Sequence, residues 1–314
     1  MNRTISFLLT SALYLALILP SSAMAKNELP ALLTEVIADA KANHASDYTR
    51  LRTLEDLAPE NYLKARVQRP TAVRAIKRLK LHNGLLIQAL LQPSLELVPV
   101  QSFPSHLSEQ EQEHWRTQVL NALQVGAASA LAHQQSPHAE AALVYALENR
   151  QYLPIHPALC VLYGRVARHL EGVTRLNKIA HTTTGLLQES AVIGLGKTRQ
   201  LQAFEVLNKM LTPSTDPSTQ RVVLHAMGHL ADRAAQKANP LPGDAEIRSK
   251  VTEAMLRRID TKAALPHETV ALSSLLLVVL PNQLSILESQ VTQARALKVV
   301  KPAFSRMTRR HIRK

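Results

Sequence analysis

The sequence predicts an all-α fold, a right-handed α-solenoid of helix–turn–helix repeats with a period of about 32 residues. The first observation behind this prediction is composition, because 9 Gly, 4% aromatic and 46% apolar residues in 314 are typical of helical proteins. The second is a small residue, here named the marker, that recurs in register directly after a large one: Leu131 and Ala132, Tyr163 and Gly164, Leu195 and Gly196, and Met227 and Gly228.

Apolar residues precede every marker at helical spacing. Two columns lie five and four residues earlier: Ala127 and Ala128, Leu159 and Cys160, Ala191 and Val192, and Val223 and Leu224. They predict one buried stripe on the first helix of each repeat. After Gly196, residues Ala203, Leu207 and Leu211 step by four and predict the buried stripe of a second helix. We expect the marker to end the first helix in a sharp turn, where glycine avoids the Cβ penalty.

The clearest repeat resembles a known family. The resemblance is carried by Ala191, Leu195, Gly196, Ala203, Leu207 and Leu211, followed by Asp216-Pro217 and Gln220-Arg221-Val222. These residues resemble the HEAT repeat, in particular its short bacterial HEAT-like form, best over Leu187–Leu230 and less closely over Leu123–His181. The resemblance implies an α-solenoid that works as a scaffold or binding surface. Some HEAT-like repeats occur in lyases that attach bilin chromophores, but no motif here carries that activity over.

The first 25 residues read as a signal peptide. Arg3 supplies a positive start, Ile5–Leu19 an apolar stretch, and Ala23-Met24-Ala25 a small-x-small cleavage site. We expect cleavage after Ala25 and a periplasmic or secreted mature chain; the alternative is an uncleaved N-terminal anchor. The longest later apolar run, Val270–Leu280, is too short to span a bilayer, so no transmembrane segment is expected in the mature chain.

Cys160 is the only cysteine, which rules out an intramolecular disulfide. Export without disulfides suits a bacterial periplasm. Because Cys160 falls in an apolar column of the repeat, we predict a small buried side chain rather than a nucleophile.

The mature chain divides into three sections. Residues 26–92 are predicted to be helical, either as a cap or as degenerate repeats, and residues 93–107 form a connection rich in proline. Residues 108–312 form the HEAT-like solenoid with a basic C-terminal helix or tail. Ser108 and Glu111 have the spacing of a capping box, which predicts a helix start. Gly126 either breaks that helix or lies within a helix that runs on to Ala132.

The formal net charge of +13 points to an acidic partner. Two stretches, residues 61–95 and 289–314, contain no acidic residue, and their candidate anion-binding side chains are Arg74, Lys77, Arg78 and Lys80, then Arg306, Arg309 and Arg310. The alternative is that these residues form only a solvated helix face and a basic tail, with no binding role. Nucleic acid is an unlikely partner, because the chain is expected to be exported and no aromatic residues interleave the basic ones for base stacking.

Two further rows follow the repeat. One residue after each marker lies a basic row, His133, Arg165, Lys197 and His229. It predicts either a basic ridge with Arg165 and Lys197 as anion-binding candidates or simply exposed turn residues. Eight residues before each marker lies a polar row, Gln124, His156, Gln188 and Gln220. Its side chains could hydrogen-bond an extended peptide or a glycan.

No catalytic or cofactor motif is present in the sequence. His225 and His229 have the i, i+4 spacing of two metal ligands on one helical face, but they are weak candidates because no H-E-x-x-H pattern and no third ligand accompany them. We therefore assign no catalytic, cofactor-binding or metal-binding residue. The sequence predicts an exported, non-enzymatic scaffold or assembly factor that binds a protein or peptide in the bacterial periplasm. The alternative is a peripheral envelope-binding module that docks on anionic lipid or cell-wall polymer.

Overall fold

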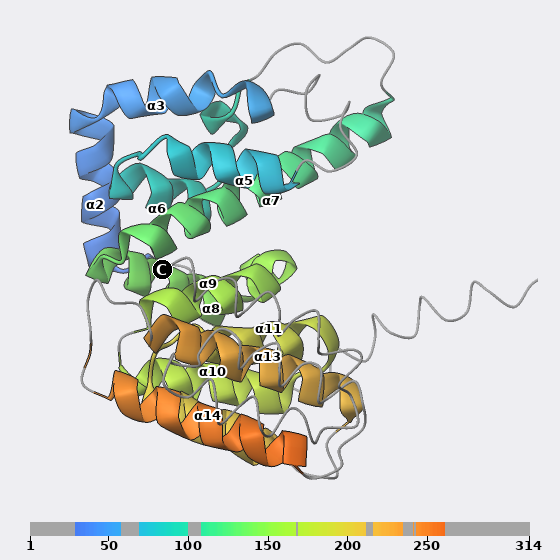
Figure 1. Ribbon diagram of the computed structural model, residues 1–314. Helices are drawn as coiled ribbons and strands as arrows, with labels where there is room; N and C mark the ends of the chain where they lie inside the picture. The colour runs from blue at the N-terminus through green and yellow to red at the C-terminus, as the bar shows by residue number, and fades with distance from the viewer. Residues whose placement is uncertain are drawn as a thin grey trace, which may run out of the picture. The chain divides into compact units, whose positions relative to one another are not determined.

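A computed structural model gives the fold, and every regular element in its described part is a helix (Figure 1). It describes residues 29–57, 69–99, 108–167, 169–211, 216–234, 241 and 243–260. The predicted all-α class is confirmed for these residues. The predicted signal peptide, most of the proline-rich connection, and Arg306, Arg309 and Arg310 lie outside them.

The N-terminal section consists of short helices. In chain order they are α2 (Ala31–Asn43), α3 (Ala45–Arg52), η1 (Glu55–Leu57), α5 (Arg69–Arg78), α6 (Asn83–Leu91) and η2 (Leu95–Leu97). Helix α6 is almost wholly buried because it packs against both α7 (Glu109–Gln134) and α8 (Pro137–Glu148). Helix α2 approaches the start of α6 so closely that a Cβ on Gly84 would lie 2.0 Å from the carbonyl oxygen of Val36.

Helix α7 begins at the predicted capping box. The Ser108 hydroxyl accepts a hydrogen bond from the Glu111 N–H at 3.3 Å, and the Glu111 carboxylate accepts one from the Ser108 N–H at 2.9 Å. Two otherwise unpaired N–H groups are satisfied in this way. Gly126 does not break the helix. It gives room to α5 instead, because a Cβ at this position would lie 2.4 Å from Cδ1 of Ile76.

The remaining helices form two sets. They are α9 (His156–Val166), preceded by η3 (Arg150–Ile155), then α10 (Leu170–Thr182), α11 (Gly185–Leu195), α12 (Leu201–Met210), α13 (Pro217–Ala234) and α14 (Asp244–Asp260). Helices α7, α9, α11 and α13 pack in succession, as do α10, α12 and α14. Helices α9, α11 and α13 of the first set also pack against members of the second. The predicted stripe of α12 is confirmed, because Ala203, Leu207 and Leu211 are all buried.

The marker residues are buried, but the reason expected for them was wrong. Ala132, Gly164 and Gly228 lie inside helices, and Gly196, which ends α11, has a helical φ of −63° rather than a left-handed one. A Cβ on Gly164 would lie 2.0 Å from the carbonyl oxygen of Gly194, and one on Gly196 would lie 2.4 Å from that of Ala226. These two positions require glycine because the backbone of another helix, α11 at Gly164 and α13 at Gly196, packs directly against them.

Candidate functional site

The basic row is positioned by the close packing of α9, α11 and α13. Arg165 lies in the last turn of α9, Lys197 directly follows α11, and His229 lies in α13. All three are partly exposed, and His133 is exposed in the last turn of α7. Arg165 and Lys197 follow markers that contact the neighbouring helix, and both act electrostatically on His229, so the structure brings the three residues to one edge of the packed helices.

Positive charge is concentrated at this edge. The pKa of His229 is lowered chiefly by its partial burial and next by the charge of Lys197. His225 and Arg165 lower it further, whereas Asp232 raises it. The lowered pKa favours the neutral imidazole, so Arg165 and Lys197 carry the larger part of the positive charge that a ligand meets there.

The first acid-free stretch presents its basic side chains on and just after α5. Ala72 and Ile76 are buried, whereas Arg74, Arg78 and Lys80 are exposed and Lys77 is partly exposed. Lys80 has a left-handed φ of 50°, which turns the chain out of the helix. This stretch is therefore a second accessible cationic surface.

The structure does not extend the weak metal pair of α13. His225 is exposed and His229 is partly buried. Among the described residues, no third histidine, cysteine or carboxylate brings a ligand atom within 4.8 Å of both. The pair therefore stays the weak candidate that its spacing indicates.

The polar row has an internal role that the sequence did not reveal. Gln124 donates to the Leu90 carbonyl at 2.9 Å, and Gln188 donates to the Ala180 carbonyl at 3.0 Å. The His156 Nε2 lies 3.1 Å from the Ala146 carbonyl oxygen, and Gln220 is buried. In each of these three hydrogen bonds the acceptor is a carbonyl in the last turn of another helix. Such carbonyls have no hydrogen-bond partner within their own helix. Gln124, Gln188 and His156 thus use hydrogen-bonding groups within the fold, which argues against a row devoted to binding a peptide or a glycan.

His156 gives a pH prediction. Burial lowers its pKa, an effect that its hydrogen bonds to Ala146 and Asn149 only partly offset. The unfolded chain therefore binds more protons than the folded one just below pH about 6.5. We expect the free energy of unfolding to fall as the pH drops through this region, and urea titrations between pH 7.5 and 5 will measure it. His156→Gln should reduce the slope without abolishing it, because His229, whose pKa is also lowered by burial, contributes to the same pH dependence.

Cys160 is buried as predicted, and burial raises the pKa of its thiol to about 12. The thiolate is the reactive form, so this side chain is inert at neutral pH.

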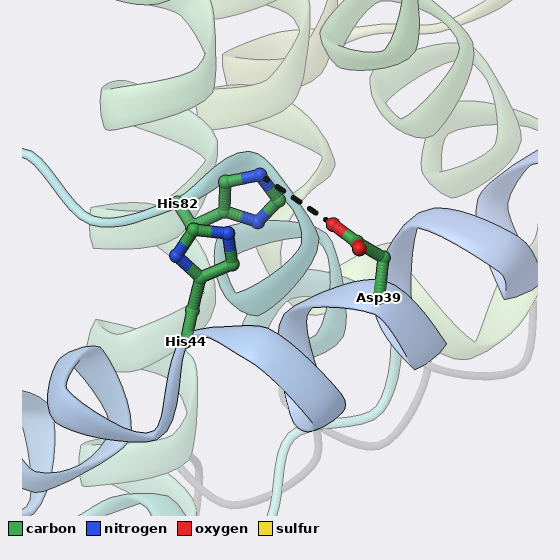
Figure 2. Close-up of side chains that lie close together, drawn as sticks. All are labelled: Asp39, His44 and His82. Atoms are coloured by element: carbon green, nitrogen blue, oxygen red, sulfur yellow. Dashed lines mark ion pairs between the residues drawn. The ribbon is translucent and has the colours of Figure 1, made fainter.

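One cluster escaped the sequence reasoning altogether. Asp39 at the end of α2, His44 between α2 and α3, and His82 before α6 lie together (Figure 2). Each offers a ligand atom, and these atoms lie within 4.8 Å of one another. Asp39 and His44 are far from His82 in the sequence, and nothing local to any of them indicates that they meet.

None of the helices in the described part of the chain is long and apolar enough to cross a membrane. The HEAT resemblance remains a prediction, since searches against protein-family models, curated proteins and solved structures found no match to this chain.

Proposed function

We propose that this protein is an exported, non-enzymatic α-solenoid of HEAT-like repeats that binds an acidic protein or peptide and acts as a scaffold or assembly factor in the bacterial periplasm. The observation that carries the proposal is that Arg165, Lys197 and His229 lie together at one edge of the packed helices α9, α11 and α13.

The helix contacts support the solenoid part of the proposal. First helices α7, α9, α11 and α13 contact in succession, and second helices α10, α12 and α14 do the same. The contacts between Gly164 and Gly194 and between Gly196 and Ala226 recur at about the 32-residue period of the sequence. This is the arrangement that helix-pair repeats adopt when they stack.

The electrostatics support an acidic partner. Arg165 and Lys197 both act electrostatically on His229, so two cationic side chains lie near one imidazole at a partly exposed edge, with Asp232 also near it. A carboxylate-rich segment would complement these two cations, and complementary charge both speeds association and selects the partner. The polar row does not compete for that segment, because its mapped hydrogen bonds are internal.

The test is a pull-down from envelope extract with the expected mature chain, Lys26–Lys314, at low and high salt. We expect one stoichiometric protein to be retained. Arg165→Glu/Lys197→Glu should weaken its binding by at least roughly tenfold, because like charges would then face an acidic partner. The matched control is Lys178→Glu/Lys209→Glu, which makes the same charge change at exposed positions of α10 and α12. Equal binding by the two double variants would contradict the proposal.

The accessible cationic surface of α5 favours a second candidate function, envelope binding through anionic lipid or cell-wall polymer. Arg74, Arg78 and Lys80 are its exposed charges. Such binding should collapse at high salt, because screening acts on exposed charges. Retention of lipid or polymer alone, lost in salt and in Arg74→Glu/Arg78→Glu, would favour this candidate over the scaffold.

A further inference from the structure

A cluster of metal-ligand side chains lies away from the basic row. Figure 2 shows Asp39 beside the imidazoles of His44 and His82, and Asp39 Oδ2 lies 4.0 Å from His82 Nε2. Next to them is a shallow hollow of about 440 Å³ lined by Glu35, Val36, Asp39, His82, Asn83 and His138. Three imidazoles and two carboxylates thus lie in or beside one small region at the junction of α2, α6 and α8.

The framework of this cluster is held by contacts that do not use its free ligand atoms. Gly84 lets the backbones of α2 and α6 touch, which fixes Asp39 opposite His82. The backbone N–H of His82 donates a hydrogen bond to Asp47 Oδ2 at 2.8 Å, and the side-chain amide of Asn43 donates one to Asp39 Oδ1 at 2.8 Å. Asp39 Oδ2 and His82 Nε2 therefore face each other from anchored residues.

The spacing between these two atoms is at the outer limit of an ion pair, which Figure 2 marks with a dashed line. At 4.0 Å they are too far apart for a hydrogen bond. A tetrahedral zinc ion with ordinary bond lengths would hold the nitrogen and the oxygen roughly 3.4 Å apart. A small side-chain rotation closes that difference.

Two local adjustments would accompany binding. The rings of His44 and His82 stack at 3.9 Å with only 8° between their planes, so both cannot aim a lone pair at one ion as they stand. His44 makes no side-chain capping bond to α3, and its ring is therefore free of that restraint when it turns. In His82, Nδ1 accepts a long 3.3 Å bond from the Gly84 N–H, and coordination through Nε2 would move the ring proton to Nδ1 and give up this bond.

The donor set selects the kind of ion. Imidazole nitrogen with one or two carboxylate oxygens suits Zn²⁺ and neighbouring transition metals, whereas Ca²⁺ and Mg²⁺ prefer oxygen ligands alone. Water, Glu35 or His138 from the adjoining hollow would complete the four ligands of zinc.

We propose that Asp39, His44 and His82 form a zinc-class metal site that ties the α2–α3 junction to the start of α6. This proposal does not depend on the proposed scaffold function. A metal bound here bridges segments separated in the sequence, so it stabilises the N-terminal section and leaves the basic row untouched.

The experiment uses the untagged full chain, stripped of metal and titrated with ZnSO₄ in a calorimeter. We expect one equivalent of Zn²⁺ with a Kd below about 10 µM. At a hundredfold excess over Kd, Zn²⁺ should raise the Tm by about 5 °C. Asp39→Asn and His44→Ala should each weaken binding at least tenfold, a loss that even outer-shell partners of a metal cause.

The matched control is His225→Ala/His229→Ala, which removes two histidines from α13 and should bind Zn²⁺ as the unaltered chain does. Circular dichroism will verify that each variant is folded. Asp39→Asn also retains the side-chain shape and an acceptor for Asn43, so its effect reports on coordination. Several weak equivalents, full binding by both single variants, or loss of binding in the control would each overturn the proposal.

Discussion

Gly164→Ala is expected to destabilise the fold by about 3 kcal/mol, at the upper end of overpacking effects. The added Cβ would lie 2.0 Å from the Gly194 carbonyl oxygen and 2.7 Å from its carbonyl carbon. Both are backbone atoms in the last turn of α11, so no side-chain rotation relieves the clash. The helices α9 and α11 must move apart, which loosens the packing of Leu195 and Tyr163 around them.

Gly126→Ala provides the matched control for this prediction. This glycine is also within a helix, but the atom nearest to an added Cβ is Cδ1 of Ile76, the end of a flexible side chain. Alanine favours a helix over glycine by about 1 kcal/mol, which offsets much of the crowding. Urea unfolding followed by circular dichroism will compare the two variants. Equal stability of Gly164→Ala and Gly126→Ala would refute the assignment of Gly164 to a backbone contact.

Arg199→Met is expected to cost about 3 kcal/mol, because it leaves a carboxylate buried without its partner. Arg199 lies in the turn after α11 and binds Asp244 at the start of α14 through two of its nitrogens. The two side chains are 11% and 9% exposed, so water screens the pair only weakly. Asp244 also accepts the Leu241 N–H at 2.7 Å, which keeps the carboxylate in place after the arginine is lost.

The double variant Arg199→Met/Asp244→Asn separates the charge from the packing. It removes the unpaired carboxylate while an amide oxygen can still accept from Leu241, so we expect it to recover more than half of the lost stability.

A surface pair provides the comparison. Arg257→Met breaks the exposed pair with Glu253 and should change the free energy of unfolding by less than about 1 kcal/mol. Chemical unfolding of the three variants measures both effects. A double variant no more stable than Arg199→Met would show that packing, not charge, holds this junction.

The features predicted correctly from sequence are those that depend on a few neighbouring residues. The capping box of Ser108 and Glu111 and the stripe through Ala203 and Leu207 follow from local spacing, and both are present. The burial of Cys160 followed from its column in the repeat. For these elements, local spacing is enough to predict a helix start or a buried face.

Features that depend on a second segment were beyond that reasoning. The spacing of Gly164 was recognised, but its cause is the backbone of α11, which the sequence of α9 does not contain. Gln124 looked like a surface donor because its acceptor, the carbonyl of Leu90, belongs to another helix. His44 and His82 are brought together only by the packing of α2 on α6.

Contact through glycine also sets how freely the protein can change without losing its surface geometry. The separation of α9 and α11, and hence of Arg165 and Lys197, is fixed by peptide groups that touch at Gly164 and Gly194. Peptide groups have the same size whatever side chains surround them. We therefore expect substitutions at buried residues such as Leu159 or Leu207 to alter the separation of α9 and α11 less than a side chain at Gly164 would. In this fold, core side chains fill the space between the helices, whereas the glycine contacts set the distance between the helix backbones.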